Sequence, residues 1–430
     1  MPDQATSKRR ALIYVLMFLL AAINYIDRSA LSVSAPSLAK EFGLDPVQLG
    51  YLFSSFLWLY VLCLVPMGYV VDRLGTRAVN ALGIATWSAA TALTGLVGSF
   101  PALLATRVLM GAGEATTYPA AGRVVREWIP LRERALFTTI FNSGAYFGPA
   151  VGALSLSWLA GVAGWRSTFL ACGAGGFVWL GAWLVWFRRP EQAAWLGAGE
   201  RAFILRERDD AAPAAGSAAG LGIGGLLRSR SLLGMMLTQG CAVYTQYLFL
   251  TWLPTYLQNA RGIPMVKSGG LTALPYLGAV LLTIAFGRIS DKLLTADAVR
   301  SGKRRGAVAL AMLASSVILL APFVDNVYAI LGLIMLALAG VATTVGLNIA
   351  LLSDMLRSPN DAGRATGLLI LGGNVFGILA PIVTGYVVSA TGSFDYAFAV
   401  AGALLVCGSL SALFLTRQPI APRPPAASLA

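Results

Sequence analysis

"GYVVDRLGTR", residues 68–77, follows a long apolar run, and a shorter form of the same pattern, "GRISDK" at 287–292, follows another apolar run 219 positions later. In both stretches a glycine is followed by three residues, an aspartate and a base. A second pair recurs at a similar offset, because "FLACGA" at 169–174 returns as "FAVAGA" at 398–403, 229 positions on. These spacings indicate that the second half of the chain duplicates the first.

The composition predicts a membrane protein. Of the 430 residues, 57% are hydrophobic and only 12% are charged, and the mean hydropathy is +0.72. A soluble domain carries about 25% charged residues. Apolar runs of roughly 20 residues, the length of a membrane-spanning helix, recur along the chain, and they are continuous rather than alternating. The twelve expected spans are 11–33, 49–70, 79–98, 101–124, 137–159, 166–187, 232–257, 268–290, 307–324, 327–352, 364–388 and 394–415.

The net charge of +13 is distributed by side of the membrane. If "SKRR" at 7–10 lies inside and the loops alternate, four of the 32 Lys and Arg lie outside, two lie within spans, and the other 26 lie inside. This asymmetry is typical of the positive-inside rule. It predicts cytoplasmic termini for a multi-pass membrane protein, and it argues against a nucleic-acid partner.

The longest polar interval, 188–231, divides the spans into six and six. We therefore expect an all-α membrane fold of two six-helix bundles, 1–187 and 232–417, joined by a cytoplasmic linker at 188–231 and followed by a cytoplasmic tail at 418–430. Two homologous bundles around a central pathway form a transporter architecture, in which substrate binds between the halves near the midplane.

Enzyme classes find little support in the sequence. The chain has no histidine and no Gly-rich Walker pattern, and the four cysteines lie singly in apolar runs, where we expect small core residues. We expect no catalytic site, no metal and no cofactor, with a proton gradient as the energy source and carboxylates as the proton carriers. A receptor that binds its ligand without transporting it remains an alternative, which uptake into sealed vesicles would distinguish.

The stretch 68–77 resembles the loop signature of the major facilitator superfamily. In it, Gly68 allows two helices to pack closely and Asp72 faces a helix N-terminus or a base. "NYIDR" (24–28), "FLWLY" (56–60) and "RVLMGAGEATTYPA" (107–120) are similar to the anion:cation symporter branch, which includes sialin and bacterial hexuronate, galactonate and glucarate permeases. The resemblance implies a monomer that takes up an organic anion with protons. The expected gating residues are Gly68, Asp72, Arg73, Gly75, Arg77 and Asp291.

Four charged residues lie inside expected spans and away from their ends: Asp27, Arg28, Arg107 and Glu114. Each such charge costs roughly 2.5–3.5 kcal/mol on insertion scales, which makes it a functional hypothesis by default. At 1.5 Å per residue, Asp27 and Arg107 lie about 12 and 9 Å below the same surface. The four charges sum to zero, and they can pair as two couples, Asp27 with Arg107 and Arg28 with Glu114.

A structural salt bridge is one interpretation of these couples, although buried pairs rarely stabilise more than apolar packing does. In the functional interpretation, Arg28 binds the substrate carboxylate and Glu114 accepts a proton. Asp27 is then a second proton site, latched to Arg107. The resemblance implies the same assignments.

Other polar residues are candidates for the substrate site: Tyr60, Gln239, Ser353 and Asn374. Tyr60 and Gln239 match sugar-acid-contacting positions of galactonate-type relatives, although such side chains also often bond to neighbouring helices. Relatives often carry an asparagine where this chain has Ile370. That departure favours a less hydroxylated acid, either aromatic, small and dicarboxylic, or sulfonated. Efflux or exchange of such an acid is the alternative to uptake.

The segment made of the cytoplasmic end of the fourth expected span and the loop after it, here called the basic loop, is rich in arginine. It carries Arg123, Arg126, Arg132 and Arg134, which we expect to hold the protein's orientation and to contact lipid headgroups. A gating role with Asp72 or Glu133 is the alternative.

Overall fold

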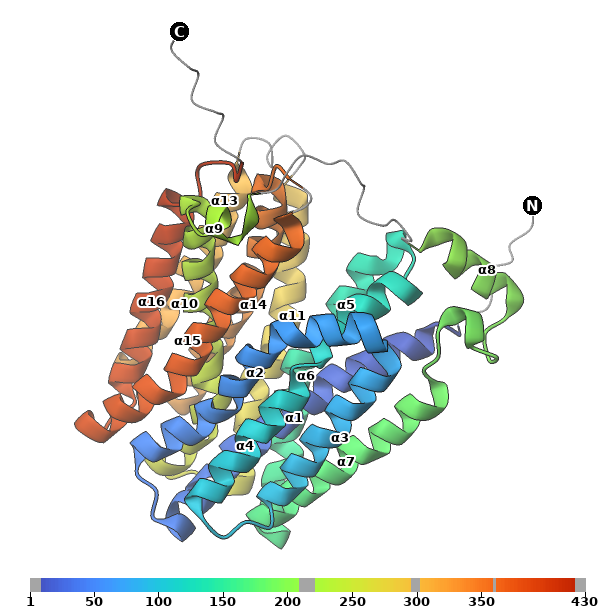
Figure 1. The fold of residues 1–430 in the computed structure, drawn as a ribbon. Helices are drawn as coiled ribbons and strands as arrows, with labels where there is room; N and C mark the ends of the chain where they lie inside the picture. Colours follow the sequence, from blue (N-terminus) through green and yellow to red (C-terminus); the bar gives the residue numbers. More distant parts are fainter. Residues whose placement is uncertain (1–8, 209–220, 295–301, 359–360, 422–430) are drawn as a thin grey trace. The chain divides into compact units, whose positions relative to one another are not determined.

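The computed structural model describes residues 9–208, 221–294, 302–358 and 361–421 (Figure 1). The described chain is helical, and a single isolated β-bridge between Leu356 and Ile420 is its only strand-like pairing. This agrees with the all-α fold expected from continuous apolar runs. The chain forms two compact units, which we describe separately.

Unit 1 contains residues 9–208 and 250–277 of the described chain. Its helices pack mainly as α1 on α6, α3 on α7, and α4 on α2 and α3. The elements of this unit are α1 (Ala11–Phe42), α2 (Pro46–Leu74), α3 (Thr76–Thr94), α4 (Phe100–Glu114), α5 (Thr117–Trp128), η1 (Leu131–Glu133), α6 (Arg134–Ala163), α7 (Trp165–Trp186), η2 (Pro190–Gln192), α8 (Ala198–Glu207) and η3 (Tyr256–Ala260).

Unit 2 contains the described residues of 212–249 and 278–430. Two long helices, α10 and α11, divide between the units, at residues 249–250 and 277–278 respectively. The domain boundaries expected from the linker at 188–231 remain a prediction. The elements are α9 (Gly222–Leu226), α10 (Arg230–Thr255), α11 (Met265–Leu293), α13 (Lys303–Ser315), η4 (Ser316–Phe323), α14 (Val327–Met355), α15 (Ala362–Thr391) and α16 (Asp395–Phe414).

Nine helical segments among the described residues are long and apolar enough to cross a membrane. The remaining three expected spans are also helical, as α3, α4 with α5, and α10, so twelve spans remain a prediction. The span expected at 101–124 is not one helix, because α4 ends at Glu114 and α5 begins at Thr117. Thr116 donates its hydroxyl to the Gly113 carbonyl oxygen, 3.0 Å away, and such bonds compete with helix continuation.

The stretch 68–77 contains the turn between α2 and α3, and that turn is the single residue Gly75. Gly75 has φ 86° and ψ 151°, a conformation that side chains with a Cβ rarely adopt. Its N–H closes α2 on the Val71 carbonyl, and α3 begins at the next residue, Thr76. The glycine of the motif is therefore required here for the backbone turn.

The interval expected as a linker is partly packed against each unit. In unit 1, where α8 lies near the start of α1 (Figure 1), Trp195 stacks on Trp128 with ring centroids 5.4 Å apart. Glu200, 3% exposed, accepts hydrogen bonds from the N–H groups of Arg9 and Arg10. In unit 2, Leu226 is fully buried in a core cluster. The composition of 188–231 predicted a linker, but it did not predict that residues near its two ends pack against the helices of each unit.

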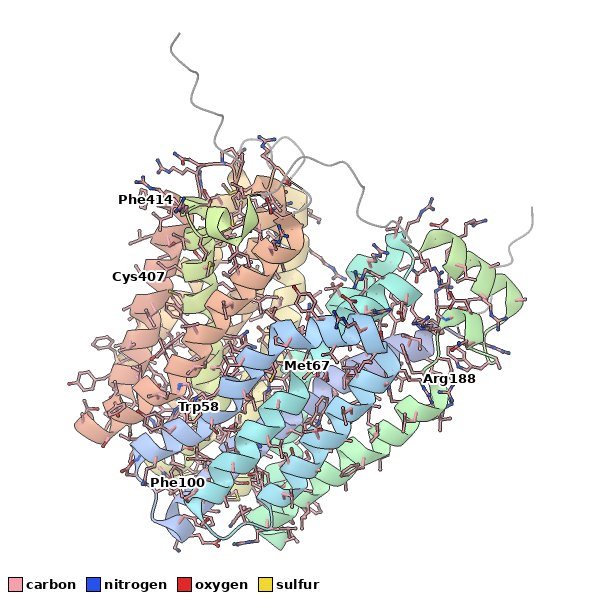
Figure 2. All side chains as sticks on the ribbon, in the orientation of Figure 1. Trp58, Met67, Phe100, Arg188, Cys407 and Phe414 are labelled. Atoms are coloured by element: carbon pink, nitrogen blue, oxygen red, sulfur yellow. The ribbon has the colours of Figure 1, made fainter. Side chains whose placement is uncertain are left out.

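The cysteines divide between core and surface. Cys172 and Cys241 are buried, Cys63 is half-buried and Cys407 is exposed. Cys407 lies on α16 with Phe414, which is 59% exposed (Figure 2). The expectation of four core cysteines is wrong for Cys407, because a span is apolar on its lipid-facing side as well as in its core.

Candidate functional site

Arg28 and Glu114 form a buried ion pair between α1 and α4. The guanidinium Nε and Nη2 atoms of Arg28 donate to Oε2 of Glu114 at 3.0 and 2.7 Å. The two side chains are 3% and 0% exposed. One of the two couples expected from the sequence is therefore present, and it is shielded from solvent.

Three aromatic rings surround the Arg28 guanidinium. Its central carbon lies 4.7 Å from the ring centroids of Tyr25 and Phe56 and 5.6 Å from that of Tyr60. Aromatic faces attract a cation and fix the plane of a guanidinium. Tyr60, expected at the substrate site, is thus placed beside Arg28, and Phe56 joins it from one turn earlier in α2.

A glycine sets the approach of α4 to α2. A Cβ built on Gly111 would lie 1.9 Å from the carbonyl oxygen of Phe56. A side chain at this position would force the two backbones apart. Glu114 follows three residues later on the same helix, so Gly111 also positions the carboxylate that meets Arg28.

Asp27 and Arg107 do not form the expected closed pair. Both are buried, at 1% and 0% exposure, and neither carboxylate oxygen nor any guanidinium nitrogen has a hydrogen-bond partner among the described residues. The two groups still act electrostatically on each other, with Glu114, Arg28 and the Cys172 thiol of α7 as further neighbours. Counting residues along each helix predicted that the two side chains lie at the same depth in the membrane. It did not predict the direction in which each side chain points from its helix, so it could not establish that they touch.

The second-half candidates make separate contacts within unit 2. Gln239, 5% exposed on α10, accepts a hydrogen bond from Asn348 of α14 at 3.1 Å. Ser353 is exposed, and its hydroxyl donates to the Ile349 carbonyl of its own helix. Asn374 likewise donates to the carbonyl of residue 370, one turn earlier on α15. The side chains of Ser353 and Asn374 thus donate to backbone carbonyls of their own helices. Their role at the substrate site remains a prediction.

The expected gating loop carries an ion network. Asp72 accepts from Arg123 at 3.1 Å and lies 3.5 Å from Arg126, while Arg123 also donates to Glu127 at 2.8 Å. Arg123 therefore contacts Asp72, and the alternative gating role expected for these residues remains a prediction.

Other members of that loop are placed differently. Arg77 donates to the Leu184 carbonyl at 2.6 Å, and Arg73 is exposed. A Cβ on Gly68 would meet no atom of the described residues within 4 Å, so the close helix packing expected at this glycine remains a prediction. Asp291 falls within α11, but its side chain lies outside the described part of the chain.

Sequence reasoning missed Tyr25, Phe56, Cys172 and Asn348. Helical spacing would have found the first two, because Tyr25 precedes Arg28 by three residues and Phe56 precedes Tyr60 by four. Cys172 and Asn348 gave no such signal, since each contacts a residue of a distant helix. In the described residues, no group of three or more His, Cys, Asp or Glu side chains lies together as a metal would require.

Apolar helices of membrane-spanning length are typical of a multi-pass membrane protein, and the buried ion pair with aromatic walls is its candidate site. Residues 17–299 and 294–429 match the Major Facilitator Superfamily, and the chain belongs to this family. The resemblance found in the sequence is therefore confirmed.

Relatives in this family have names that refer to organic acids. The chain is 34% identical to the "Probable galactarate/D-glucarate transporter" of Bacillus subtilis (strain 168), over 95% of this chain and 92% of that one. It is 32% identical to the "Probable sulfoacetate transporter" of Cupriavidus necator (strain ATCC 17699), over 95% and 94%. A solved D-xylose-proton symporter covers 95% of this chain and 98% of its own with a TM-score of 0.71, and at 15% identity this likeness shows the fold alone.

Proposed function

We propose that the protein takes up a small organic acid together with protons, by alternating access. The substrate class is a sugar acid, which the name of the galactarate/D-glucarate relative supports. The protein acts as a monomer in the bacterial inner membrane with both termini cytoplasmic, as the distribution of Lys and Arg suggests.

The Arg28–Glu114 pair is the observation that carries this proposal. A substrate carboxylate and the Glu114 carboxylate are acceptors for the same N–H groups of Arg28. When Glu114 takes up a proton, it loses its negative charge and its hold on the guanidinium. The guanidinium of Arg28 can then bind the substrate anion, so that proton and anion are bound together.

Asp27 supplies a second proton site. Its carboxylate is buried without a hydrogen bond, close enough to Arg107 to interact electrostatically. Moving one charge against 100 mV costs about 2.3 kcal/mol, so the anion's charge needs compensation on the way in. One proton makes the transport of a monoanion electroneutral, and a second makes it electrogenic.

A sulfonate is the second candidate substrate. The name of the sulfoacetate relative supports it, and so does Ile370, which puts an apolar side chain where a hydroxyl-binding amide often stands. A guanidinium binds a sulfonate through the same N–H groups as a carboxylate. Efflux or exchange of the same acids is the alternative direction.

The experiment is uptake of labelled D-glucarate and labelled sulfoacetate into sealed right-side-out vesicles. We expect accumulation when the outside is made acidic, collapse of accumulation with a protonophore, and no requirement for sodium. Vesicles with an Arg28→Ala protein are the control. Uptake that follows a sodium gradient and ignores pH would contradict proton coupling, and binding without accumulation would indicate a receptor.

A further inference from the structure

Unit 1 contains a cavity of about 410 Å³ with charged walls. Its lining comes from the end of α2, the second half of α5, and the residues that precede and follow α8. Figure 1 shows α5 and α8 at the same end of this unit. The lining residues are Asp72, Arg123, Arg126, Glu127, Arg189, Pro190, Glu191 and Arg208. The volume suits a small ligand, since such sites measure roughly 300–1,000 Å³, but the lining is that of an ion site rather than an apolar pocket.

Hydrogen bonds to the backbone join the segments that form this cavity. Arg123 of α5 donates to the Val71 carbonyl of α2 at 2.9 Å. The indole N–H of Trp128, which is fully buried on α5, donates to the Arg188 carbonyl at 3.1 Å. The backbones of α2, α5 and the segment after α7 are therefore connected directly beside the cavity, so the fold of unit 1 brings their charged side chains together.

The arginines outnumber the acids around the cavity. Four arginines and three acids leave a net charge of +1, and each acid already has an arginine partner. Arg123 holds two of the acids, Asp72 at 3.1 Å and Glu127 at 2.8 Å. Arg189 is exposed, and its side chain forms no ion pair or hydrogen bond with the residues that the structure describes. The surplus positive charge therefore lies at the cavity wall without a fixed counter-charge.

The donors of these arginines suit an oxyanion. A guanidinium binds phosphate oxygens in pairs through its planar fork of N–H groups. Arg126 is 60% exposed at its side chain and lies 3.5 Å from Asp72, so it keeps donors toward the cavity. A phosphate monoester carries a charge of about −1.5 to −2 near neutral pH and offers three acceptor oxygens, which arginines from several segments can share. A carboxylate has one negative charge and fewer acceptors.

We propose that this cavity binds a phosphate group, carried either by a soluble phosphate compound or by a lipid headgroup. All but one of its lining residues lie outside the expected spans, on the side that the distribution of Lys and Arg predicts to be cytoplasmic. The cavity shares no residue with the Arg28–Glu114 pair, so the proposal stands apart from the proposed function. Asp72 competes with the phosphate for Arg123 and Arg126.

The test is a calorimetric titration of the purified full chain with inorganic phosphate, in nanodiscs of phosphatidylcholine. Potassium chloride keeps the ionic strength constant, because exposed charges are screened by salt. We expect saturable binding and a rise in Tm with phosphate that chloride alone does not produce. Arg189→Gln should raise the Kd about tenfold, because one charge-assisted contact is lost. Asp72→Asn should lower the Kd, because a competing carboxylate is removed.

Arg206→Gln is the matched control. Arg206 lies on α8, two residues before Arg208, is 75% exposed at its side chain and does not line the cavity. This change removes the same charge as Arg189→Gln does, and it should leave the Kd unchanged. The proposal is overturned by a lack of saturable binding at constant ionic strength, by equal losses in the two variants, or by weaker binding in Asp72→Asn.

A second set of nanodiscs distinguishes the two sources of phosphate. These nanodiscs contain phosphatidylglycerol, whose negative surface potential lowers the local phosphate concentration for every variant alike. The readout is therefore the ratio of the Kd of Arg189→Gln to that of the wild type. A ratio that stays at about ten supports a soluble ligand. A ratio that falls toward one supports a lipid headgroup in the cavity, because the headgroup then excludes inorganic phosphate from the wild type.

Discussion

Both hydrogen bonds from Arg28 to Glu114 end on the same carboxylate oxygen, Oε2, while Oε1 of Glu114 is buried without a partner. An unpartnered carboxylate oxygen in a buried site is a costly acceptor. It is also the atom to which a proton can add without first displacing Arg28. In the proposed mechanism, the oxygen that accepts the proton and the oxygen that binds Arg28 are therefore different atoms of one side chain.

Replacing Glu114 by glutamine tests its role in coupling. The neutral amide mimics the protonated state, so Glu114→Gln should still exchange labelled for unlabelled D-glucarate but lose accumulation driven by an imposed pH gradient. Glu41→Gln is the control, because Glu41 is also paired with an arginine, Arg166 at 2.6 Å, but at an exposed position. A Glu114→Gln protein that still concentrates substrate on a pH gradient would remove Glu114 from the mechanism.

The anion receptor is tested at Arg28. Arg28→Ala should abolish binding of D-glucarate, measured by calorimetry or by ligand-induced change in Tm, while expression is retained. Arg28→Lys should recover little, because an ammonium lacks the planar fork that two N–H groups provide and fits the three rings less well. Arg166→Lys serves as the control. Normal binding by Arg28→Ala would show that the receptor lies elsewhere.

The amino-acid sequence predicted the fold class because apolar runs of membrane-spanning length are a strong signal, and it located Asp27, Arg28, Arg107 and Glu114 because charge inside such runs is rare. It did not predict which acid meets which base. Depth along a helix follows from residue count, whereas contact between two helices depends on rotation and packing, which the sequence alone does not report. For this reason the predicted contact between Asp27 and Arg107 is not present in the structure, although both residues are buried as expected.

The break at residues 115–116 was missed for a related reason. The run 101–124 carries no Gly-Pro dipeptide that would predict a break, and the hydroxyl bond of Thr116 to Gly113 lies at the point where α4 ends. Polar contacts between helices, such as that of Asn348 with Gln239, carry no periodic signal and required coordinates.

Asp27 tests whether the second proton site is needed for the conformational change. Asp27→Asn removes the negative charge that interacts electrostatically with Arg107. It also removes the carboxylate that could take up a proton at this position. We expect loss of both accumulation and exchange of D-glucarate, in contrast to Glu114→Gln. Glu41→Gln, at an exposed ion pair with Arg166 and 40% exposed at its side chain, is the comparison and should retain exchange. Exchange that survives in Asp27→Asn would limit Asp27 to coupling.

Cysteine labelling tests the topology. In a background without the four native cysteines, single cysteines near Gly43 and Gly262 should react with an impermeant maleimide added to intact cells. A cysteine at Ala215 should react only after the cells are opened. Removal of Cys407 matters most for this background, since it is the exposed native cysteine. The reverse labelling pattern would contradict cytoplasmic termini.

Gly111 tests whether the approach of α4 to α2 positions the coupling pair. A Cβ at this residue would fall 1.9 Å from the Phe56 carbonyl oxygen, so Gly111→Ala must move one backbone and with it the Phe56 ring or Glu114. Overpacking of this kind costs about 1–3 kcal/mol of unfolding free energy. We expect Gly111→Ala to have a lower Tm than the wild type. We also expect it to bind D-glucarate more weakly, by more than the lower free energy of unfolding accounts for. Gly122→Ala on α5, where a Cβ would meet nothing within 4 Å, is the matched control and should change neither. If Gly111→Ala lowers Tm but binds D-glucarate as the wild type does, then Gly111 serves packing alone and does not set the geometry of Arg28 and Glu114.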